Sequence, residues 1–386
     1  RSPSPPRNHA HTRHCTGPLM SNPHSPPIAT PVADAAGGKC SSRPLYDIRD
    51  PNERQLGWPA GAVAISEEEL LRRCEGAGFD LSGWIMCAQG VRSLEAVQRL
   101  RQHGFNRFSS VSGGFTGWQA AGLPAEYPAG LDASQADRYA RHLVMPQVGP
   151  QGQRKLLNTR ILLAGLGGLN SPVAMYLAAA GVGTLGLLDF DTVERSNLQR
   201  QVLHGESRIG QSKAESACTR IQDINPGIAT EILDLKLTPQ NAGELAADWD
   251  IVIDGTDSFE TRYALNRACL EHGTPLVYGA VMRFQGQVSV FWPSGPGQDS
   301  SPCFQCLMPR APAEGEAPGC AEAGVLGILP GIVGTLQANE ALKLALGIGR
   351  VLIGELLMVD ALNMEFRRMK LPADPSCSSC GSQPPG

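Results

Sequence analysis

The sequence predicts an α/β protein in which a small α/β domain precedes a larger domain built on a mostly parallel β-sheet. Two observations support this prediction. Between residues 44 and 124, short strand-like segments alternate with helical segments, which is typical of a small parallel sheet. From residue 160 to residue 188, a buried strand, a glycine loop, a small-residue helix and a second buried strand follow one another, as in a βαβ unit. The 386 residues suffice for two or three domains with buried cores.

Composition argues against several classes of protein. The net charge of -4 and the pI of about 6.1 give no sign of a nucleic-acid-binding surface. The apolar runs near 173–190 and 323–338 are interrupted by glycines and Pro330, so no membrane-spanning segment is expected. The eleven cysteines include two C-x-x-C pairs and do not resemble a secreted disulfide framework. We therefore expect a soluble, cytoplasmic protein in a reducing compartment.

The N-terminal residues 1–38 are rich in Pro, Ser, His and Ala, and their first acidic residue is Asp34. Such a segment cannot bury enough apolar surface to fold alone, so we expect it to be disordered. It has no apolar signal-peptide core, and we expect translation to start at Met20. A transit peptide is the alternative, which the prolines disfavour because they prevent an amphipathic helix.

The first domain is expected over residues 40–127, with strands at 45–48, 84–86 and 107–111 and helices at 67–74 and 93–103. Its chemical feature is Cys87, which follows a strand and precedes a helix. Backbone N–H groups of such a loop and of the helix N-terminus favour an anion, and Arg92 adds a positive charge. The loop therefore favours a reactive thiolate or persulfide over the alternative of a buried structural cysteine.

The motifs around this loop resemble those of the rhodanese sulfurtransferases. They are Asp47-Ile-Arg49-Asp50, Gly61-Ala62, Cys87 to Ser93, Gly104-Phe105 and Gly113-Gly114-Phe-Thr-Gly117-Trp118. The resemblance implies that Cys87 carries sulfur as a persulfide and that Arg92 helps to hold the anion. The family usually has Gly-His-Ile before the Gly-Ala pair, whereas this sequence has Gly57-Trp58-Pro59-Ala60. We expect an altered supporting loop there, with the chemistry retained.

A short Pro-, Gly- and Ala-rich stretch predicts a linker at 128–136, and the second domain is expected over 137–386. This domain should be Rossmann-like, with a strand at 161–164, glycines at 165, 167 and 168, a helix at 171–180 and a strand at 185–188. Asp189 ends the second strand, about twenty residues after the glycines, where such units bind ribose. The glycines alone would also fit a dinucleotide-dependent oxidoreductase. The cationic run that follows, with Arg200 and Lys213, instead favours a triphosphate.

The second domain resembles the MoeB/ThiF adenylyltransferases, relatives of the ubiquitin-activating enzymes, from about Asp137 to Gly381. The resemblance rests on Arg138-Tyr-x-Arg141, Gly165 to Asn170, Asp189-Phe-Asp191, Ser196-Asn-Leu-Gln-Arg200-Gln, Lys213, Ile224-Asn-Pro226 and Asp254-Gly-Thr-Asp257. It implies that the C-terminal glycine carboxylate of a ubiquitin-like sulfur-carrier protein attacks the α-phosphate of ATP, giving an acyl-adenylate and pyrophosphate. Arg141, expected on one helix with Arg138, would reach the partner's site in a homodimer.

The matching positions predict a set of contacts with ATP. The glycines would approach the phosphates, Asp189 would bind the ribose, and Asp257 would hold Mg²⁺. Asn197, Arg200 and Lys213 would bind phosphate oxygens. The full set of expected nucleotide contacts is Gly165, Gly167, Gly168, Asp189, Ser196, Asn197, Leu198, Gln199, Arg200, Lys213, Asp257 and Ser258. Asn170 stands where the family usually has a third glycine, and we expect it to substitute as a residue that tolerates a left-handed turn.

Four cysteines in two C-x-x-C pairs, Cys303/Cys306 and Cys377/Cys380, predict a structural tetrahedral zinc in the C-terminal part. A closed set of four ligands leaves no open position for catalysis. Cys320 lies in a glycine-bearing segment whose position in the family faces the adenylate, which implies a catalytic role for it. The alternative is a dispensable loop thiol.

Together these features predict a fused adenylyltransferase and sulfurtransferase. Its expected partners are a carrier with a Gly-Gly C-terminus and a sulfur donor such as a cysteine desulfurase. The Ser196 to Gln201 run favours the small subunit of molybdopterin synthase as the carrier, and the thiamine-pathway carrier is the alternative. A non-catalytic scaffold is a further alternative, which the presence of Cys87 and Asp257 disfavours.

Overall fold

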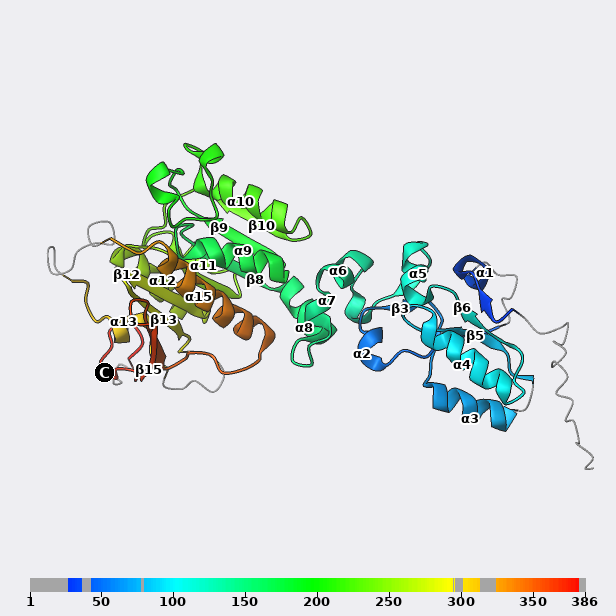
Figure 1. The fold of residues 1–386 in the computed structure, drawn as a ribbon. Helices are drawn as coiled ribbons and strands as arrows, with labels where there is room; N and C mark the ends of the chain where they lie inside the picture. Colours follow the sequence, from blue (N-terminus) through cyan, green and yellow to red (C-terminus); the bar gives the residue numbers. More distant parts are fainter. Residues whose placement is uncertain are drawn as a thin grey trace, which may run out of the picture. The chain divides into compact units, whose positions relative to one another are not determined.

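The computed structural model describes residues 27–36, 43–77, 80–293, 295, 301–312 and 324–381. The chain forms two compact units, Arg1–Tyr127 and Pro128–Gly386. Each unit is an α/β structure with its own sheet and its own buried clusters (Figure 1). No helix among the described residues is long and apolar enough to cross a membrane.

The first unit contains a five-stranded parallel sheet. The strand order is β1 (Ala29–Thr30), β6 (Phe108–Val111), β5 (Gly83–Met86), β2 (Leu45–Asp47) and β4 (Val63–Ala64). Helices α3 (Glu67–Ala77) and α4 (Val91–Gln102) contribute to the cluster around Leu70 and Phe108, whereas α1 (Val32–Ala36) and α5 (Gly114–Ala120) contribute to the cluster around Trp84 and Trp118. The short helix α2 (Pro51–Arg54) follows β2 and begins with a capping box between Asp50 and Glu53.

Residues 27–36 differ from the predicted disorder of residues 1–38. β1 pairs in parallel with β6, and Val32, Ala35 and Ala36 of α1 pack against the cluster around Trp84. The segment folds because it uses a sheet edge and an apolar face supplied mainly by distant residues of β5, β6 and α5, which composition does not reveal. Residues 1–26, including Met20, lie outside the described residues.

The unusual Gly57–Ala60 segment of the first unit forms β3 (Trp58–Pro59), which pairs antiparallel with β7 (Ala125–Glu126). The Trp58 indole N–H donates a hydrogen bond to the Glu126 carboxylate at 3.1 Å. The Gly57 backbone has φ +105°, and a side chain there would collide with the Tyr127 ring. The substituted loop therefore ties the end of this unit back to its body.

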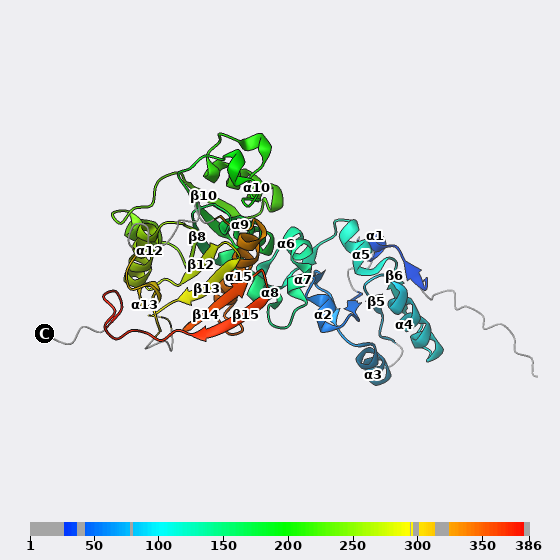
Figure 2. The same cartoon turned by 60° about the vertical axis from the view of Figure 1, so that its left-hand side comes forward.

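The second unit is organised around an eight-stranded sheet. Five strands run in parallel, in the order β10 (Ala229–Leu233), β9 (Thr184–Leu188), β8 (Arg160–Ala164), β11 (Ile251–Asp254) and β12 (Leu276–Met282). β13 (Gln285–Phe291), β14 (Glu355–Asp360) and β15 (Glu365–Lys370) continue the sheet antiparallel. The sheet is thus Rossmann-like at one end and a meander at the other (Figure 2).

Helices cover both faces of this sheet. α9 (Asn170–Ala180), α10 (Lys213–Ile224) and α15 (Ile328–Leu346) contribute to the buried cluster around Val173, and α11 (Ala242–Ala246), α12 (Phe259–His272) and α13 (Phe304–Leu307) contribute to the one around Phe304. α8 (Gly149–Asn158) leads into β8 and contacts α15. β8, β9 and β11 are almost wholly buried. Because the five strands run parallel, the loops at their carboxyl ends lie along one edge of the sheet.

The predicted single helix with Arg138 and Arg141 on one face is wrong. α6 (Ala133–Arg138), which starts within the predicted linker at a capping box between Asp132 and Gln135, ends before α7 (Ala140–Leu143). The break is at Tyr139, whose hydroxyl accepts a hydrogen bond from Asn225 at 2.9 Å and whose ring occupies the space beside Gly181. These tertiary contacts outweigh the local helical preference, so the two arginines belong to different helices.

Candidate functional site

A cavity of about 740 Å³ opens at the carboxyl ends of the parallel strands in the second unit. Ten of the predicted nucleotide contacts border it, namely Gly165, Gly167, Gly168, Asp189, Ser196, Gln199, Arg200, Lys213, Asp257 and Ser258. The predicted contacts Asn197 and Leu198 do not border it; they lie in and just after the short 3₁₀ helix Arg195–Asn197 that carries Ser196. The fold therefore brings residues from four separate sequence segments to one cavity.

The glycine loop between β8 and α9 is held by Asp189. Gly165 has φ +79°, which favours glycine, and its N–H donates to the Leu188 carbonyl at 2.7 Å. The buried Asp189 carboxylate accepts hydrogen bonds from the N–H groups of Leu166 at 2.7 Å and Asp191 at 2.9 Å. Burial raises the pKa of Asp189, although Lys213 and these N–H donors oppose that effect. Asp189 thus orders the loop at the position predicted to bind ribose.

Two of the cations that border the cavity, Lys213 and Arg200, were predicted to bind phosphate oxygens. Lys213 is the first residue of α10, and its buried side chain places Nζ 2.8 Å from the Asp191 carboxylate. Arg200 is half-buried and donates a hydrogen bond to the Ser196 carbonyl at 3.1 Å. A Lys and an Arg beside a glycine loop form a site that suits the charge of a nucleotide phosphate chain.

Asp257 borders the cavity in the loop after β11 and is exposed. The loop that presents it is fixed by Asp254, which is buried and accepts hydrogen bonds from Thr256 N at 2.9 Å and Oγ1 at 2.7 Å. Burial raises the pKa of Asp254, and Arg262, whose Nε lies 3.4 Å away, counteracts this shift. An exposed carboxylate in a braced loop is suited to hold a hard cation such as Mg²⁺.

Several residues that border the cavity were missed by the sequence analysis. They include the loop after β10 from Leu235 to Gln240, Arg262 of α12 and Pro330 of α15. The loop after β10 had a usable signal, because every loop after a parallel strand reaches this sheet edge. Arg262 and Pro330 had none, since only the packing of α12 and α15 brings them to the cavity.

Asn170 does not occupy a left-handed turn, so that expectation is wrong. It begins α9, and the described non-glycine residues with positive φ are Ala129, Arg283 and Met364. Its side chain is buried, and its amide donates to the Gly165 carbonyl at 2.7 Å and the Ala164 carbonyl at 3.2 Å. Asn170 therefore satisfies carbonyls at the end of β8 that lie beside the glycine loop.

Arg141 is exposed on α7 and does not border the cavity. Arg138 donates a hydrogen bond to the Ile224 carbonyl at 2.9 Å, at the end of α10. The Arg138 and Asn225 motif residues therefore fasten α6 and α7 to the domain.

Cys87 lies in the first unit, in the loop between β5 and α4, and is 1% exposed. Its Sγ accepts hydrogen bonds from the Gly90 N–H at 3.1 Å and the Ser93 hydroxyl at 3.3 Å. Burial opposes ionisation of the thiol, but the hydrogen bonds from Ser93, Gln89 and Gly90 together hold the pKa of Cys87 below its ordinary value. The loop therefore stabilises a thiolate, as a persulfide-carrying cysteine requires.

The Cys87 loop is enclosed by the start of α5. The Cys87 carbonyl accepts a hydrogen bond from Phe115 N at 2.9 Å, and a side chain at Gly114 would lie 2.3 Å from the same carbonyl oxygen. Arg92 forms an ion pair with Glu53 of α2 and is about half-exposed. The glycines thus allow a close approach of two loops, while Arg92 contacts a carboxylate instead of Cys87 Sγ.

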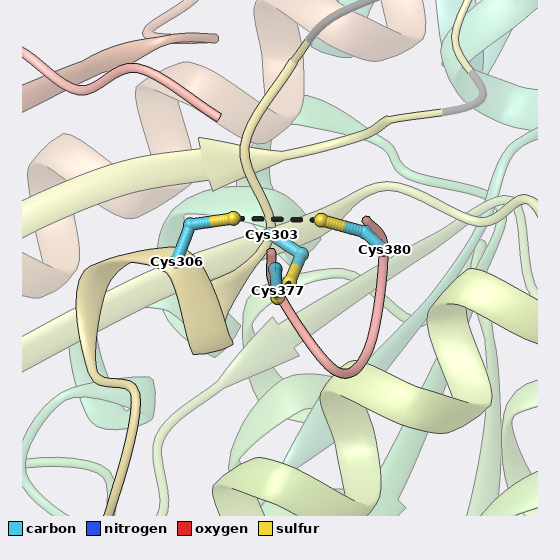
Figure 3. Close-up of side chains that lie close together, drawn as sticks. All are labelled: Cys303, Cys306, Cys377 and Cys380. Atoms are coloured by element: carbon cyan, nitrogen blue, oxygen red, sulfur yellow. Dashed lines mark hydrogen bonds between the residues drawn. The ribbon is translucent and has the colours of Figure 1, made fainter. Parts of the chain in front are cut away.

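The cysteines of the two C-x-x-C pairs come together in the second unit (Figure 3). Their four sulfur atoms lie within 4.8 Å of one another, with 3.7 Å between Cys303 and Cys377 and 3.4 Å between Cys306 and Cys380. Sulfur ligands at ~2.3 Å from a tetrahedral zinc would be about 3.8 Å apart, so the cluster fits that metal. A metal here would join α13 to the C-terminal residues 377–380. Cys320 lies outside the described residues.

Comparison with known proteins identifies both units. The ThiF family matches residues 139–379, and the rhodanese-like domain matches residues 32–121. The SAMP-activating enzyme E1 of Haloferax volcanii is 47% identical over 251 residues, which cover 65% of this chain and 91% of that protein. The sulfur carrier protein adenylyltransferase of Thermus thermophilus is 46% identical over 250 residues, which cover 65% of this chain and 92% of that protein.

A relative with both activities in its name is the probable adenylyltransferase/sulfurtransferase MoeZ of Mycobacterium tuberculosis, 47% identical over 64% of this chain and 62% of its own length. Among solved structures, MccB of E. coli with ATP aligns with a TM-score of 0.55 at 18% identity, covering 76% of this chain and 82% of that one. At that identity the alignment supports the fold alone. The family matches and the relatives together show that this chain belongs to the ThiF family of E1-like adenylyltransferases and carries a rhodanese-like sulfurtransferase domain in front of it.

Proposed function

We propose that this protein uses ATP to adenylylate the C-terminal glycine of a ubiquitin-like sulfur-carrier protein, and that this carrier is the small subunit of molybdopterin synthase. The observation that carries the proposal is the cavity bordered by the glycine loop, Arg200, Lys213 and Asp257. The sulfur-carrier and E1 names of the relatives support a protein carboxylate as the second substrate. The Ser196 to Gln201 run favours the molybdopterin carrier over the thiamine-pathway carrier.

The proposed chemistry is an in-line displacement at the α-phosphate. A carboxylate oxygen of the carrier forms a bond to the α-phosphorus, and the bond to the bridging oxygen of pyrophosphate breaks. Lys213 and Arg200 would neutralise the charge that develops on the phosphate oxygens, and Asp257 would hold the Mg²⁺ that accompanies ATP. Asp189 would bind the ribose with the acceptor capacity that its two N–H partners leave free.

Arg141 is proposed to act across a homodimer. It is exposed and away from the cavity of its own chain, so it would need the site of a second copy to reach a phosphate. The residues just before its helix, Arg138 at the end of α6 and Tyr139, are fastened to the domain, which would give the arginine a fixed direction.

Sulfur transfer is proposed to pass through Cys87. Its persulfide, recharged by a donor such as a cysteine desulfurase, would attack the acyl-adenylate, form an acyl disulfide and release AMP. A thiol reductant would then cleave the S–S bond and release the carrier thiocarboxylate. The covalent link between the two units raises the effective concentration of one for the other. Cys320 is proposed to have a catalytic role, and a zinc bound by the four clustered cysteines would stabilise the C-terminal part.

The decisive experiment is carrier-dependent ATP–pyrophosphate exchange with each of the two carriers. We expect exchange with the molybdopterin carrier, and a marked loss in Arg141→Ala that an equimolar site-defective subunit with Arg141 intact partly restores. Exchange with the thiamine-pathway carrier alone would transfer the proposal to that pathway, and exchange with neither would refute it. Thiocarboxylate formation from a sulfane donor should be lost in Cys87→Ala, while exchange persists.

A further inference from the structure

A buried histidine contacts the backbone of the glycine loop. His204 follows the cationic run and is 8% exposed. One ring nitrogen, Nε2, is 3.0 Å from the Leu166 carbonyl oxygen of the glycine loop, and the other, Nδ1, is 2.9 Å from the Ser216 hydroxyl of α10. The ring therefore connects two elements that both border the cavity, and the adenylyl-transfer chemistry proposed above does not use it.

The contact with Leu166 places a proton on one nitrogen of the ring. A carbonyl oxygen can only accept a hydrogen bond, so Nε2 carries a proton, and in the neutral ring Nδ1 accepts from the Ser216 hydroxyl. Burial lowers the pKa of His204, against the hydrogen bond to Leu166, and the charge of Lys213 acts in the same direction as burial. The ring is thus a neutral donor directed at the glycine loop.

Leu166 is held on both sides. Its N–H donates to Asp189, and its carbonyl accepts from His204. The Leu166 carbonyl and the Gly167 N–H belong to one planar trans peptide, in which the two groups point in opposite directions. When His204 fixes the carbonyl, it also directs the Gly167 N–H away from the histidine. Gly167 borders the cavity, and its N–H has no backbone acceptor in the described part of the chain.

His204 also holds the loop relative to Lys213. Ser216 lies three residues after Lys213, on the first turn of α10, and the Ser216 carbonyl accepts a hydrogen bond from Arg208 at 3.0 Å. α10 contacts α9, the helix that follows the glycine loop (Figure 1). The imidazole therefore connects the Leu166 carbonyl of the glycine loop to α10, the helix that begins with Lys213.

We propose that His204 is a positioning residue for ATP, which orients the Gly167 N–H toward a phosphate oxygen by holding the Leu166 carbonyl. This inference rests on the proposed function for the identity of the nucleotide. It assigns His204 a role through the loop backbone, without contact to the substrate.

Two substitutions separate this role from general stability. In His204→Gln the side-chain amide reaches as far as imidazole Nε2 and can still donate to Leu166, whereas the amide of His204→Asn reaches only as far as Nδ1. Both variants lose packing of the ring. A third variant, Ser216→Ala, removes the Nδ1 partner and leaves the donor to Leu166 in place.

The measurements are Mg²⁺–ATP affinity by calorimetry without carrier, thermal unfolding, and the KM for ATP and the kcat of pyrophosphate exchange. We expect His204→Asn to weaken ATP affinity about tenfold, the scale of one lost hydrogen bond to a loop donor. His204→Gln and Ser216→Ala should stay within about threefold of the native protein, even where their unfolding temperatures fall as far as that of His204→Asn.

Equal losses of affinity in His204→Gln and His204→Asn, or losses that follow the unfolding temperature, would overturn the proposal. So would native affinity in a folded His204→Asn. A native protein that binds Mg²⁺–ATP but exchanges pyrophosphate with neither carrier would refute the proposed function, while the calorimetric comparison of the variants would still decide the role of His204.

Discussion

Replacing Ser93 with alanine should raise the pKa of the Cys87 thiol and slow its reactions at neutral pH. The Ser93 hydroxyl donates to Cys87 Sγ at 3.3 Å, and both residues are buried. Ser93 is foremost among the donors that hold the pKa of Cys87 low against burial. Removing a donor that favours the thiolate leaves burial less opposed, so the pKa must rise.

The magnitude follows from the hydrogen bond itself. A hydrogen bond to a charged group is worth about 1.5–3 kcal/mol, and the long contact to a soft sulfur acceptor places this one near the lower end. Because one pKa unit corresponds to about 1.4 kcal/mol, the expected rise is about one unit. Where the pH lies below the pKa, the thiolate fraction and the rate of alkylation should fall by about tenfold.

The assay is the pH dependence of iodoacetamide alkylation in the intact protein, followed at the Cys87 peptide by mass spectrometry. The matched control is Ser110→Ala, because the Ser110 hydroxyl contacts Ser93 at 2.8 Å and makes no hydrogen bond to Cys87 Sγ. Its profile should shift by less than half a unit. A Ser93→Ala profile that coincides with that of the native protein would refute the electrostatic role of the serine.

Three further outcomes test the second unit. Cys377→Ser should reduce bound zinc, measured by atomic absorption, and lower the unfolding temperature; unchanged metal content would contradict the proposed site. Lys213→Met should weaken Mg²⁺–ATP binding in calorimetry by ten- to a hundredfold, because its Nζ is a buried positive charge at the cavity beside the glycine loop, and a weaker effect than that of Arg200→Met would count against this. Asn170→Ala should lower the free energy of unfolding by about 1–3 kcal/mol in urea titration, since buried carbonyls lose a donor, and a neutral effect would show that water replaces the amide.

Local sequence pattern was sufficient wherever one segment carried the whole signal. The strand Arg160–Ala164, the glycine loop and the helix after it form one compact βαβ unit, and the structure confirms their order. Each C-x-x-C pair is likewise a local signal. The four cysteines of the two pairs lie together in the structure, as ligands of one shared metal would. In these cases a short stretch of sequence was enough to predict the element or the cluster of side chains that the structure shows.

Pattern was insufficient where a distant segment decides the local conformation. β1 forms because it pairs with β6, about eighty residues away. The helix breaks at Tyr139 because the Tyr139 side chain bonds to Asn225 and packs beside Gly181. The same limit applies at the cavity. Arg262 and Pro330 border it only because of how α12 and α15 pack against the sheet. In the sequence, the residues that make such long-range contacts have no feature nearby that would predict them.

Asn170 illustrates how such a residue can be interpreted. A glycine at this position would remove the amide that donates to the Gly165 carbonyl, while the Ala164 carbonyl would keep its bond from the Gly255 N–H. The same amide occupies the space beside Gly255, where a side chain would lie 2.5 Å from Asn170 Nδ2. The loop after β8 and the loop after β11 therefore approach each other because one has a long polar side chain and the other has none. Asn170 therefore places a hydrogen-bonded amide where these two loops, which both border the cavity, approach each other.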